Sequence, residues 1–284
     1  MTPLPFVKMQ GSGNDFVLLD GFRRRVRLTA SEARRLADRH FGVGADQILI
    51  LEKSRRADFR LRILNADGSE AEMCGNGIRC AALYASKTRR VKKNEMSVET
   101  KAGVLRPVLL GRGPEGALVR VDMGEPILEA ADIPTRSAQR RVIETDFQWL
   151  AGDGKPETAK ITCVSMGNPH CVIFVDDLAS VPVEAWGPVL EKDPFFPKRT
   201  NVEFVQVDSP DRGRVRVWER GAGATLACGT GACAAGVAGV LTGRFRRKAA
   251  LALPGGTLTV EWAPDNHVFM TGPAAFVGEG VWNR

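Results

Sequence analysis

Apolar positions along this chain either alternate with polar ones or form short runs that end at Gly, Asp or Asn. Both patterns are typical of strands that are buried on one or both faces. The first half of the chain contains five such predicted strands, at 16–20, 47–51, 59–64, 97–110 and 117–123. A last apolar run predicts a closing strand at about 274–282, which we expect to return and complete the first part of the fold.

One segment of the first half has residues typical of helix ends at both of its boundaries. Residues 29–40 begin at Thr29 or Ser31, either of which can serve as an N-cap, and stop before Gly42. The segment 125–160, rich in Pro, Gly and charged residues, predicts no element and separates the two halves of the chain.

Two further helices are predicted directly after cysteines. Residues 79–86 and 233–240 are rich in helix formers, and they follow Cys74 and Cys228 by a few positions. Each cysteine is therefore expected at the N-terminus of an apolar helix.

Short polar motifs recur along the chain at a constant offset. Cys228 lies 154 positions after Cys74 (228 − 74 = 154), and each cysteine is followed by Gly-x-Gly. The same offset relates three more pairs: Gly13-Asn14 with Gly167-Asn168, Gln47 with Asn201, and Asn65 with Glu219. Four matches at one offset indicate an internal duplication, and hence two similar lobes.

The duplication and the strand pattern together predict an α+β fold. We expect two pseudo-symmetric lobes, each a mostly antiparallel sheet wrapped around a central apolar helix, with the active site between the lobes. The N-terminal lobe is predicted to comprise 1–124 with the C-terminal strand 273–284, and the C-terminal lobe to comprise 125–272.

An uncharged stretch at 221–243 is long enough to raise the question of a membrane span. Its glycines and threonines favour a buried helix that packs closely against a neighbour. Residues 1–10 lack the pattern of a secretory signal, and no lipidation motif is visible. We therefore expect a cytoplasmic protein without a membrane anchor.

Six cysteines in a cytoplasmic chain are expected to be thiols, because the cytosol keeps most thiols reduced. Their spacing also disfavours zinc, since structural zinc sites usually contain C-x₂-C pairs or paired histidines. Cys80, Cys163, Cys171 and Cys233 have no repeated context and are expected to be packing residues.

The charge balance leaves nucleic acid as a partner to be weighed. Forty Lys and Arg residues against thirty-three Asp and Glu residues give a net charge of +7. The basic residues form short runs at 23–25, 89–93 and 244–248, which are typical of solvated helix ends and turns, and a single tyrosine leaves little for base stacking. No nucleic-acid partner is expected.

The two repeated cysteines suggest proton transfer. A helix N-terminus can lower the pKa of a thiol, and its N–H groups, uncovered by neighbouring glycines, can hold a carboxylate. Inverting a stereocentre requires removal of a proton from one face and delivery to the other, for which one thiolate and one thiol suffice. Cys74 and Cys228 could instead be packing residues in tight turns, but packing alone does not explain their recurrence with the same Gly-x-Gly.

Five motifs, in order along the chain, resemble those of the diaminopimelate epimerase family. They comprise Gly13-Asn14-Asp15-Phe16, Gly44-Ala45-Asp46-Gln47, the segment 65–80, Gly167-Asn168-Pro169-His170, and the segment 219–231. The resemblance implies interconversion of LL- and meso-diaminopimelate without pyridoxal phosphate, metal or other cofactor, in lysine and peptidoglycan biosynthesis, by a homodimer.

The resemblance also assigns roles to residues. Cys74 and Cys228 match the proton-transfer cysteines, while His170 and Glu219 match residues that assist catalysis. The implied substrate contacts are Asn14, Gln47, Asn65, Gly75, Asn76, Asn168, Asn201, Glu219, Arg220, Gly229 and Thr230. Arg220 suits the distal carboxylate because its guanidinium is a planar, bidentate donor.

Three alternatives remain open at the level of sequence. A two-thiol racemase acting on proline or hydroxyproline has a similar arrangement of Cys-Gly motifs, although Asn65, Asn201 and Arg220 favour a distal amino-acid group. A thiol redox or sensor protein would pair Cys74 with Cys228 in a reversible disulfide. A binding protein would keep the pocket without turnover.

Overall fold

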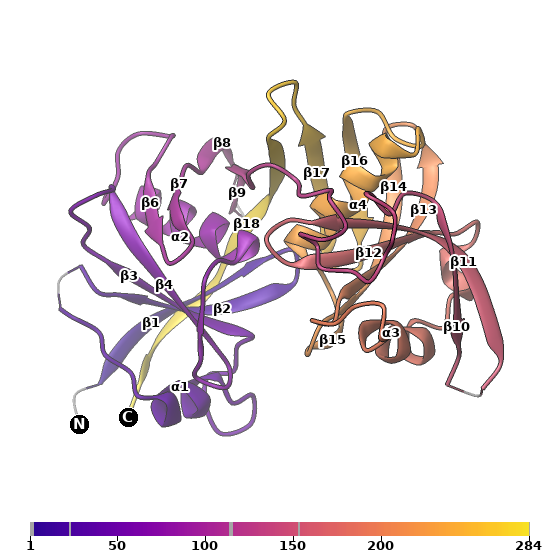
Figure 1. Cartoon of the computed structure of the whole chain (residues 1–284). Helices are drawn as coiled ribbons and strands as arrows, with labels where there is room; N and C mark the ends of the chain where they lie inside the picture. Colours follow the sequence, from indigo (N-terminus) through magenta and orange to yellow (C-terminus); the bar gives the residue numbers. More distant parts are fainter. Residues whose placement is uncertain (1–2, 23, 114–115, 153, 284) are drawn as a thin grey trace. The chain divides into compact units, whose positions relative to one another are not determined.

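The computed structural model describes residues 3–22, 24–113, 116–152 and 154–283 (Figure 1). The chain divides into two compact units. Unit 1 comprises Met1–Asp122 and Thr271–Arg284, and unit 2 comprises Met123–Met270. The second crossing from one unit to the other falls inside the long last strand, β18 (Val268–Trp282).

Unit 1 contains two helices and most of the shorter strands. Its elements are β1 (Leu4–Gly11), β2 (Asn14–Asp20), α1 (Ala30–Ala37), β3 (Gln47–Glu52), β4 (Phe59–Asn65), β5 (Glu70–Ala71), α2 (Gly75–Lys87), β6 (Val98–Thr100), β7 (Gly103–Leu105), β8 (Val108–Gly113) and β9 (Gly116–Asp122), with the greater part of β18. β18 pairs antiparallel with β1, with Leu4 opposite Trp282, so the last strand of the chain joins the first one.

Helix α2 forms the centre of unit 1, with strands around it (Figure 1). Residues Gly75 to Ser86 of the helix are all buried, and the helix packs against β1, β2, β3, β4, β8 and β9. A helix that is buried on all sides needs mostly small or apolar residues, which the segment supplies apart from a few polar residues such as Asn76 and Arg79. The prediction of a helix starting just after Cys74 is confirmed.

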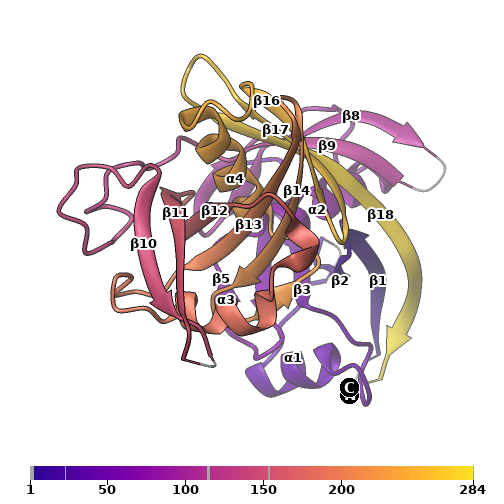
Figure 2. The ribbon, with the colours of Figure 1, turned by 90° about the vertical axis from the view of Figure 1, so that its right-hand side faces the viewer.

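Unit 2 repeats this plan. Its elements are β10 (Thr145–Leu150), β11 (Pro156–Ser165), β12 (Pro169–Phe174), η1 (Leu178–Ser180), α3 (Val183–Glu191), β13 (Asn201–Ser209), β14 (Arg212–Glu219), β15 (Gly223–Thr225), α4 (Gly229–Leu241), β16 (Lys248–Leu253), β17 (Gly256–Trp262) and the start of β18. Figure 2 shows α4 against strands β12, β13 and β14.

Glycines let α4 approach its neighbours closely. A Cβ atom on Gly239 would lie 2.1 Å from the Phe245 ring, and one on Gly236 would lie 2.7 Å from Val260. Residues 229–241 of the uncharged stretch therefore form a closely packed helix, as the composition predicted, while 223–225 form the short strand β15. Across the described part of the chain, no helix has both the length and the apolar character that a membrane crossing requires.

The duplication is visible in the strand registers. In unit 1 the parallel pair β2 and β3 places Phe16 opposite Gln47, and in unit 2 the parallel pair β12 and β13 places His170 opposite Asn201. Both pairs are related by the 154-residue offset. Helices α2 and α4 are each 13 residues long and start 154 positions apart, directly after Cys74 and Cys228.

Two predicted boundaries in unit 1 need correction. The predicted strand 97–110 is broken into β6, β7 and β8, because Pro107 lacks an N–H and Gly103 adopts a positive φ of 121°. The predicted helix 29–40 starts at its Thr29 cap but ends at Ala37, where Asp38 is extended and its carboxylate accepts the N–H groups of His40 and Phe41.

Several elements were not predicted from the sequence. They include β1, helix α3, strands β12, β16 and β17, and the antiparallel hairpin β10–β11, which begins inside the segment that gave no pattern. The hairpin follows the turn at Glu144, which has a positive φ of 47°. Strands and few helices in two similar units confirm the predicted α+β class.

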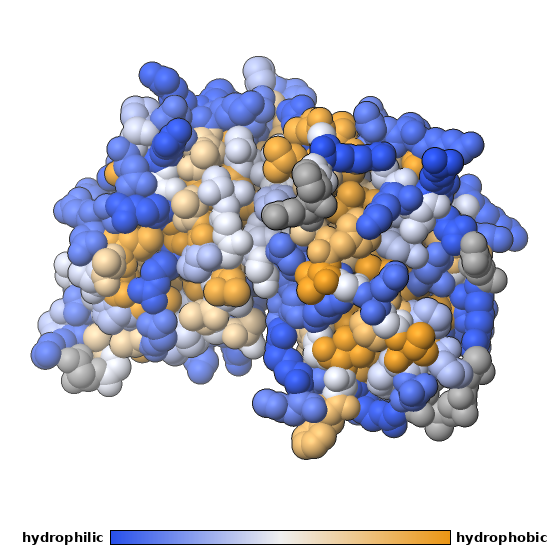
Figure 3. Space-filling view, turned by 180° about the vertical axis from the view of Figure 1, so that it is seen from behind, coloured by the Kyte–Doolittle hydropathy of each residue, from blue (hydrophilic) through white to orange (hydrophobic). Residues whose placement is uncertain are grey.

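Hydrophilic side chains cover most of the face seen in Figure 3, with apolar patches between them. In unit 1, several large apolar side chains are exposed on strands that neighbour one another: Leu110 of β8, Leu118 of β9, and Val277 and Val281 of β18. Exposed apolar groups on adjacent strands are a feature of surfaces that bind a partner.

Candidate active site

Cys74 is the N-cap residue of α2. Its backbone is extended, with φ −144° and ψ 113°, and its sulfur accepts a hydrogen bond of 3.3 Å from the N–H of Gly77. The thiol is partly exposed. The helix dipole and the first-turn N–H groups therefore face the region around this sulfur, as the sequence predicted.

Asn14 lies next to this thiol. Its Oδ1 is 3.8 Å from the sulfur of Cys74 and 3.3 Å from Nδ2 of Asn76, while its own Nδ2 donates to Asp46 over 2.8 Å. The predicted residue Asn14 thus contacts both Cys74 and Asn76, which flank Gly75. The supporting Asp46 was missed, although it belongs to the motif that contains Gln47.

Gln47 and Asn65 face each other at the same edge of the unit 1 sheet. Parallel β2 and β3 begin at this edge and antiparallel β4 ends there, which places Gln47 opposite Asn65. Nε2 of Gln47 donates to Oδ1 of Asn65 over 2.9 Å, and Nδ2 of Asn65 donates to Ser69 over 2.9 Å. Within the described residues, the buried Oε1 of Gln47 has no hydrogen-bond partner.

A fully buried arginine, which sequence reasoning missed, connects the N-terminus of α2 with the turn before β2 and with β18. The guanidinium of Arg79 donates to the carbonyl oxygens of Gly75 and Pro273 and to the hydroxyl of Ser12. It thereby fixes the first turn of α2 to the turn that precedes Asn14. The signal that could have found it is an arginine inside an otherwise apolar helix.

Cys228 is the N-cap residue of α4, in the same role as Cys74. Its sulfur accepts from the N–H of Gly231 over 3.3 Å and lies 3.4 Å from the hydroxyl of Thr230. The residue is buried, with 5% of its surface exposed. Gly229 and Thr230, predicted to hold a carboxylate, form the first turn of the helix.

The surroundings of Cys228 correct one expectation. Burial raises the pKa of the Cys228 thiol well above its ordinary value, and the nearby carboxylates of Glu219 and Glu203 raise it further. Hydrogen bonds from Thr230 and Gly231 lower the pKa but do not outweigh these effects. The lowering expected at a helix N-terminus therefore does not prevail at this thiol.

Glu219 ends strand β14 beside Cys228. Burial raises the pKa of its carboxyl group above the ordinary value, against the opposing effects of hydrogen bonds with Thr225 and Cys228 and of the nearby His170. The Thr225 hydroxyl donates to Oε1 over 2.5 Å. A carboxyl group with a raised pKa next to a thiol is typical of sites that move protons.

His170 is fully buried at the start of β12. Its Nδ1 lies 2.7 Å from Oε1 of Glu203, and its Nε2 lies 3.1 Å from Oδ1 of the predicted Asn168. Glu203, also fully buried, was not predicted as a site residue. The available signal was one carboxylate within the apolar run of β13.

Asn201 organises the segment that carries Arg220. Its Nδ2 donates to the carbonyl oxygen of Pro169 over 2.7 Å, and its Oδ1 accepts from the backbone N–H of Arg220 over 2.9 Å. The Arg220 side chain donates to the carbonyl oxygen of Lys198. Glu191, which the sequence did not single out, accepts from the N–H of Gly221 over 3.1 Å.

Each unit thus gathers its own share of the predicted residues. Unit 1 holds Asn14, Gln47, Asn65, Cys74, Gly75 and Asn76, and unit 2 holds Asn168, His170, Asn201, Glu219, Arg220, Cys228, Gly229 and Thr230. Both sets lie at the N-terminus of the central helix of their unit and at the strand ends beside it.

The remaining cysteines are buried thiols that lie within helices or strands and are not N-cap residues. Cys163 and Cys171 lie opposite each other on β11 and β12, and burial raises the pKa of Cys80 to about 12. Among the described residues, no three His, Cys, Asp or Glu side chains come together as metal ligands do.

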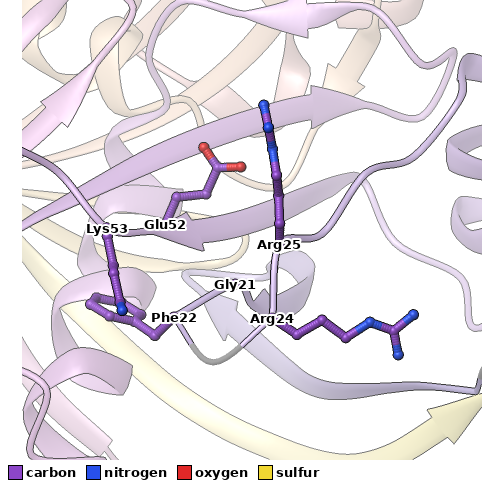
Figure 4. Close-up of a pocket in the computed structure, with 6 residues that line it drawn as sticks. All are labelled: Gly21, Phe22, Arg24, Arg25, Glu52 and Lys53. Carbon is purple, nitrogen blue, oxygen red and sulfur yellow. The ribbon is translucent and has the colours of Figure 1, made fainter.

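A pocket of about 360 Å³ in unit 1 has a different character. Figure 4 shows its lining residues, of which Glu52 and Arg25 point the same way and Arg24 points away from the others. Lys53 and Phe22 complete the polar and aromatic wall. No predicted site residue lines this pocket. Arg24 and Arg25, which line it, come from the basic run at 23–25, of which Arg23 lies outside the described residues.

Solved structures of other proteins share the fold of this chain. The phenazine biosynthesis protein of the PhzF family from Bacillus anthracis superposes with a TM-score of 0.70 at 17% identity, covering 99% of both chains. A hydroxyproline epimerase from Agrobacterium vitis superposes with a TM-score of 0.70 at 15% identity, covering 99% of this chain and 91% of its own. The fold is thus the two-unit α+β fold of these proteins.

Comparison with related sequences identifies the family of this chain. The family model of diaminopimelate epimerase matches residues 6–129 and 162–277. The diaminopimelate epimerase of Moorella thermoacetica is 52% identical over 277 residues, which cover 97% of this chain and 98% of the relative. That of Pelotomaculum thermopropionicum is 51% identical, with 98% of both chains covered. The chain belongs to the diaminopimelate epimerase family.

Family membership makes the chain an enzyme of the isomerase class, and both the predicted resemblance and the prediction of an epimerase are confirmed. The family match covers the helix N-termini with Cys74 and Cys228 and every other predicted site residue.

Proposed function

We propose that this chain interconverts LL- and meso-diaminopimelate, using Cys74 and Cys228 as the acid–base pair and no cofactor. One observation carries the proposal above the rest: each thiol caps a buried helix at equivalent positions of a duplicated fold. The names of the sequence relatives support the substrate. The reaction would serve lysine and peptidoglycan biosynthesis.

In the proposed mechanism the two thiols act on one α-carbon from opposite faces. One sulfur, as thiolate, removes the α-proton, and the other, as thiol, delivers a proton to the opposite face. The reverse reaction exchanges the two roles. General-base catalysis contributes about 10²- to 10⁴-fold, or roughly 3 to 5 kcal/mol. Stabilisation of the carbanion by the helix-end N–H groups would supply more.

The reacting end of the substrate is proposed to lie at the helix N-termini. First-turn N–H groups of Gly75-Asn76 and of Gly229-Thr230 would hold the α-carboxylate, because helix N-termini attract anions. His170 and Glu219 would assist by setting the protonation of the thiols. The raised pKa of Glu219 supports this role, since the group can exchange protons nearer to neutral pH than an exposed carboxyl group.

The distal amino-acid end is proposed to meet the remaining polar side chains. Arg220 would bind the distal carboxylate, with Asn201 holding its backbone in place. Gln47 and Asn65 would recognise the ammonium group, because the buried Oε1 of Gln47 is an acceptor without a partner among the described residues. Asn14 and Asn168 complete the set of amides that distinguish donors from acceptors.

A homodimer in the cytoplasm is proposed as the working form. The exposed apolar side chains of β8, β9 and β18 in unit 1 support a second copy as the occupant of that surface. Light scattering after gel filtration would give the mass, and a monomer at micromolar concentration would contradict the dimer.

Proton NMR in D₂O tests the activity itself. Reduced protein treated with a chelator is mixed with LL-diaminopimelate, and in a second tube with L-proline. Loss of one α-proton signal with growth of the meso form supports the proposal. Exchange on proline alone would favour the proline-racemase reaction of a protein with the same fold. Exchange on neither would favour redox chemistry or binding, and would overturn the proposal.

A further inference from the structure

A buried carboxylate stands behind the histidine of unit 2. Glu203 lies on β13, adjacent to β12, and its side chain and that of His170 both have 0% of their surface exposed. Oε1 of Glu203 is 2.7 Å from Nδ1 of the ring. Its second oxygen, Oε2, has no hydrogen-bond partner among the described residues.

The fold itself does not require a charge at this place. The residues at equivalent positions of unit 1 are Phe16 and Leu49, 154 positions before His170 and Glu203. A Cβ atom on Gly77 of α2 would lie 3.0 Å from Leu49 and 3.4 Å from Phe16. One niche beneath a helix N-terminus thus holds an apolar pair.

In unit 2 the corresponding niche holds the polar pair. A Cβ atom on Gly231 of α4 would lie 2.6 Å from Oε1 of Glu203, so the carboxylate directly contacts the first turn that carries Cys228. Burial of a carboxylate is unfavourable unless a partner compensates for lost hydration. An apolar pair would satisfy packing without that penalty, which points to a role in the site.

The hydrogen-bond chemistry of the pair defines that role. With Glu203 ionised, its carboxylate only accepts hydrogen bonds, and the short contact then places a proton on Nδ1 of His170. The other ring nitrogen, Nε2, lies 3.1 Å from Oδ1 of Asn168, which is an acceptor. This contact is a hydrogen bond when Nε2 also carries a proton, or when the Asn168 amide is turned so that its Nδ2 donates to Nε2. Carboxylates that fix the tautomer and orientation of a functional histidine are a general device of active sites.

We propose that Glu203 is a positioning residue, which holds His170 with its proton on Nδ1 and directs Nε2 toward Asn168 in the acid–base site of Cys228. The kinetic consequence rests on the proposed function. The other ionisable groups around the pair are Glu219 of β14, Cys228 of α4 and Cys171 of β12. The raised pKa of Cys228, to which Glu203 contributes, agrees with this arrangement.

Nitrogen-15 NMR of ligand-free protein tests the tautomer directly. The chain has three histidines, His40, His170 and His267, so histidine labelling gives a simple spectrum in which His170→Phe identifies the buried ring. We expect a protonated, hydrogen-bonded Nδ1 in the wild type and a changed ring signal in Glu203→Leu. A wild-type ring protonated on Nε2 alone, or an unchanged spectrum in the variant, would overturn the inference.

Kinetics measure what the positioning contributes. Loss of such a supporting carboxylate typically lowers activity about 10- to 100-fold. We expect Glu203→Gln to lower kcat by that factor with little change in KM, because the amide remains an acceptor without the charge. Unchanged kcat in Glu203→Gln and Glu203→Leu would overturn the inference.

A double variant separates positioning from folding. The double variant with His170→Phe and Glu203→Leu has an apolar pair like that of unit 1. Its unfolding temperature should be at least as high as that of Glu203→Leu alone, because no buried histidine is left without its partner. Its activity should stay low. Recovery of activity together with stability would show that the pair is structural.

The chain also offers a matched control. Glu125 lies 4.0 Å from Nε2 of the partly exposed His267. Glu125→Gln should leave the His170 signal and kcat unchanged. Because the NMR experiment needs no substrate, absence of turnover on diaminopimelate would contradict the proposed function without deciding the tautomer of His170. A His170 ring protonated on Nε2 alone would contradict only the inference about Glu203.

Discussion

Gln47 donates a hydrogen bond of 2.9 Å through Nε2 to Oδ1 of Asn65, and this contact fixes the orientation of both side-chain amides. It leaves Oε1 of Gln47 buried and without a partner among the described residues. A buried acceptor of this kind is unfavourable unless a ligand completes it.

Removing that acceptor should weaken substrate binding. We expect Gln47→Leu to lower kcat/KM about 10- to 100-fold, because a hydrogen bond to a charged group contributes roughly 1.5 to 3 kcal/mol. Steady-state kinetics with LL-diaminopimelate measure the change. The exposed Gln148 provides the control, and equal activity of Gln47→Leu and Gln148→Leu would remove Gln47 from the binding site.

Asp15, next to Asn14 in the sequence, should stabilise unit 1 in a pH-dependent way. Burial raises its pKa, but hydrogen bonds with Arg39 and Lys8 outweigh burial and hold the pKa well below its usual range. A depressed folded pKa stabilises the protein above the unfolded pKa, near 3.8, and this contribution is lost as the pH falls below it.

We therefore expect Asp15→Asn to lower the free energy of unfolding by roughly 1.5 to 3 kcal/mol at pH 7. The difference from wild type should shrink as the pH falls below about 3.8. Urea unfolding at several pH values measures it. Asp208→Asn, which removes a more exposed pair with Arg214, should change stability by less than about 1 kcal/mol. Equal effects of the two variants would contradict the argument.

Hydrophobic periodicity predicted several strands and helix α1, and the repeat predicted the central helices. Cys74 and Cys228, with the same Gly-x-Gly after them, located the N-termini of both central helices, although the predicted segments 79–86 and 233–240 are shorter than the helices. The boundary at Pro107 could also have been predicted, since a proline within a strand pattern argues against an unbroken strand. The hairpin in the segment 125–160 had no repeat and no clear periodicity.

The supporting residues of the site could not be found in the same way. Glu203 has Leu49 as its counterpart, and Arg79 has Cys233, so the repeat gives no signal at either position. Their roles depend on burial beside a helix N-terminus, which is a property of packing. The direction of the Cys228 pKa was missed for the same reason, because two carboxylates distant in sequence produce it.

Arg220 should be sensitive even to a change that keeps its charge. Lysine is a point charge without the planar fork that binds a carboxylate through two N–H groups. We expect Arg220→Lys to lower kcat/KM by about tenfold, mostly through KM. Arg214→Lys, at an exposed pair with Asp208, is the matched control. Unchanged kcat/KM in Arg220→Lys would separate this residue from the substrate.

The ionisation of Cys228 should respond to Glu219. Burial and the carboxylates of Glu219 and Glu203 raise the pKa of the thiol, so its thiolate should form only at alkaline pH. Removing one negative charge lowers that pKa. We expect Cys228 to become reactive toward iodoacetamide at a lower pH in Glu219→Gln than in the wild type. Mass spectrometry of the peptide that contains Cys228 measures the extent of alkylation at each pH.

Comparing pH dependence within each protein removes the effect of burial on the absolute rate of alkylation. Thr225→Val, which removes the hydroxyl that donates to Glu219 but keeps the carboxyl group, is a useful comparison. It should raise the pKa of Glu219 and leave the Cys228 profile closer to wild type. A Cys228 profile that is the same in wild type and Glu219→Gln would contradict the electrostatic account.

Single removal of either thiol should abolish epimerisation while the fold survives. Cys74→Ala and Cys228→Ala each lack one of the two proton carriers, so we expect turnover to fall by at least about 10²- to 10⁴-fold. The buried Cys163→Ala, in the core of unit 2, controls for the loss of a sulfur. Both active-site variants should still be stabilised by meso-diaminopimelate in thermal unfolding, because the N–H groups and Arg220 remain. Near-normal turnover in either one would refute a two-thiol mechanism, whereas loss of ligand stabilisation in both would mean that the thiols act in binding rather than in proton transfer.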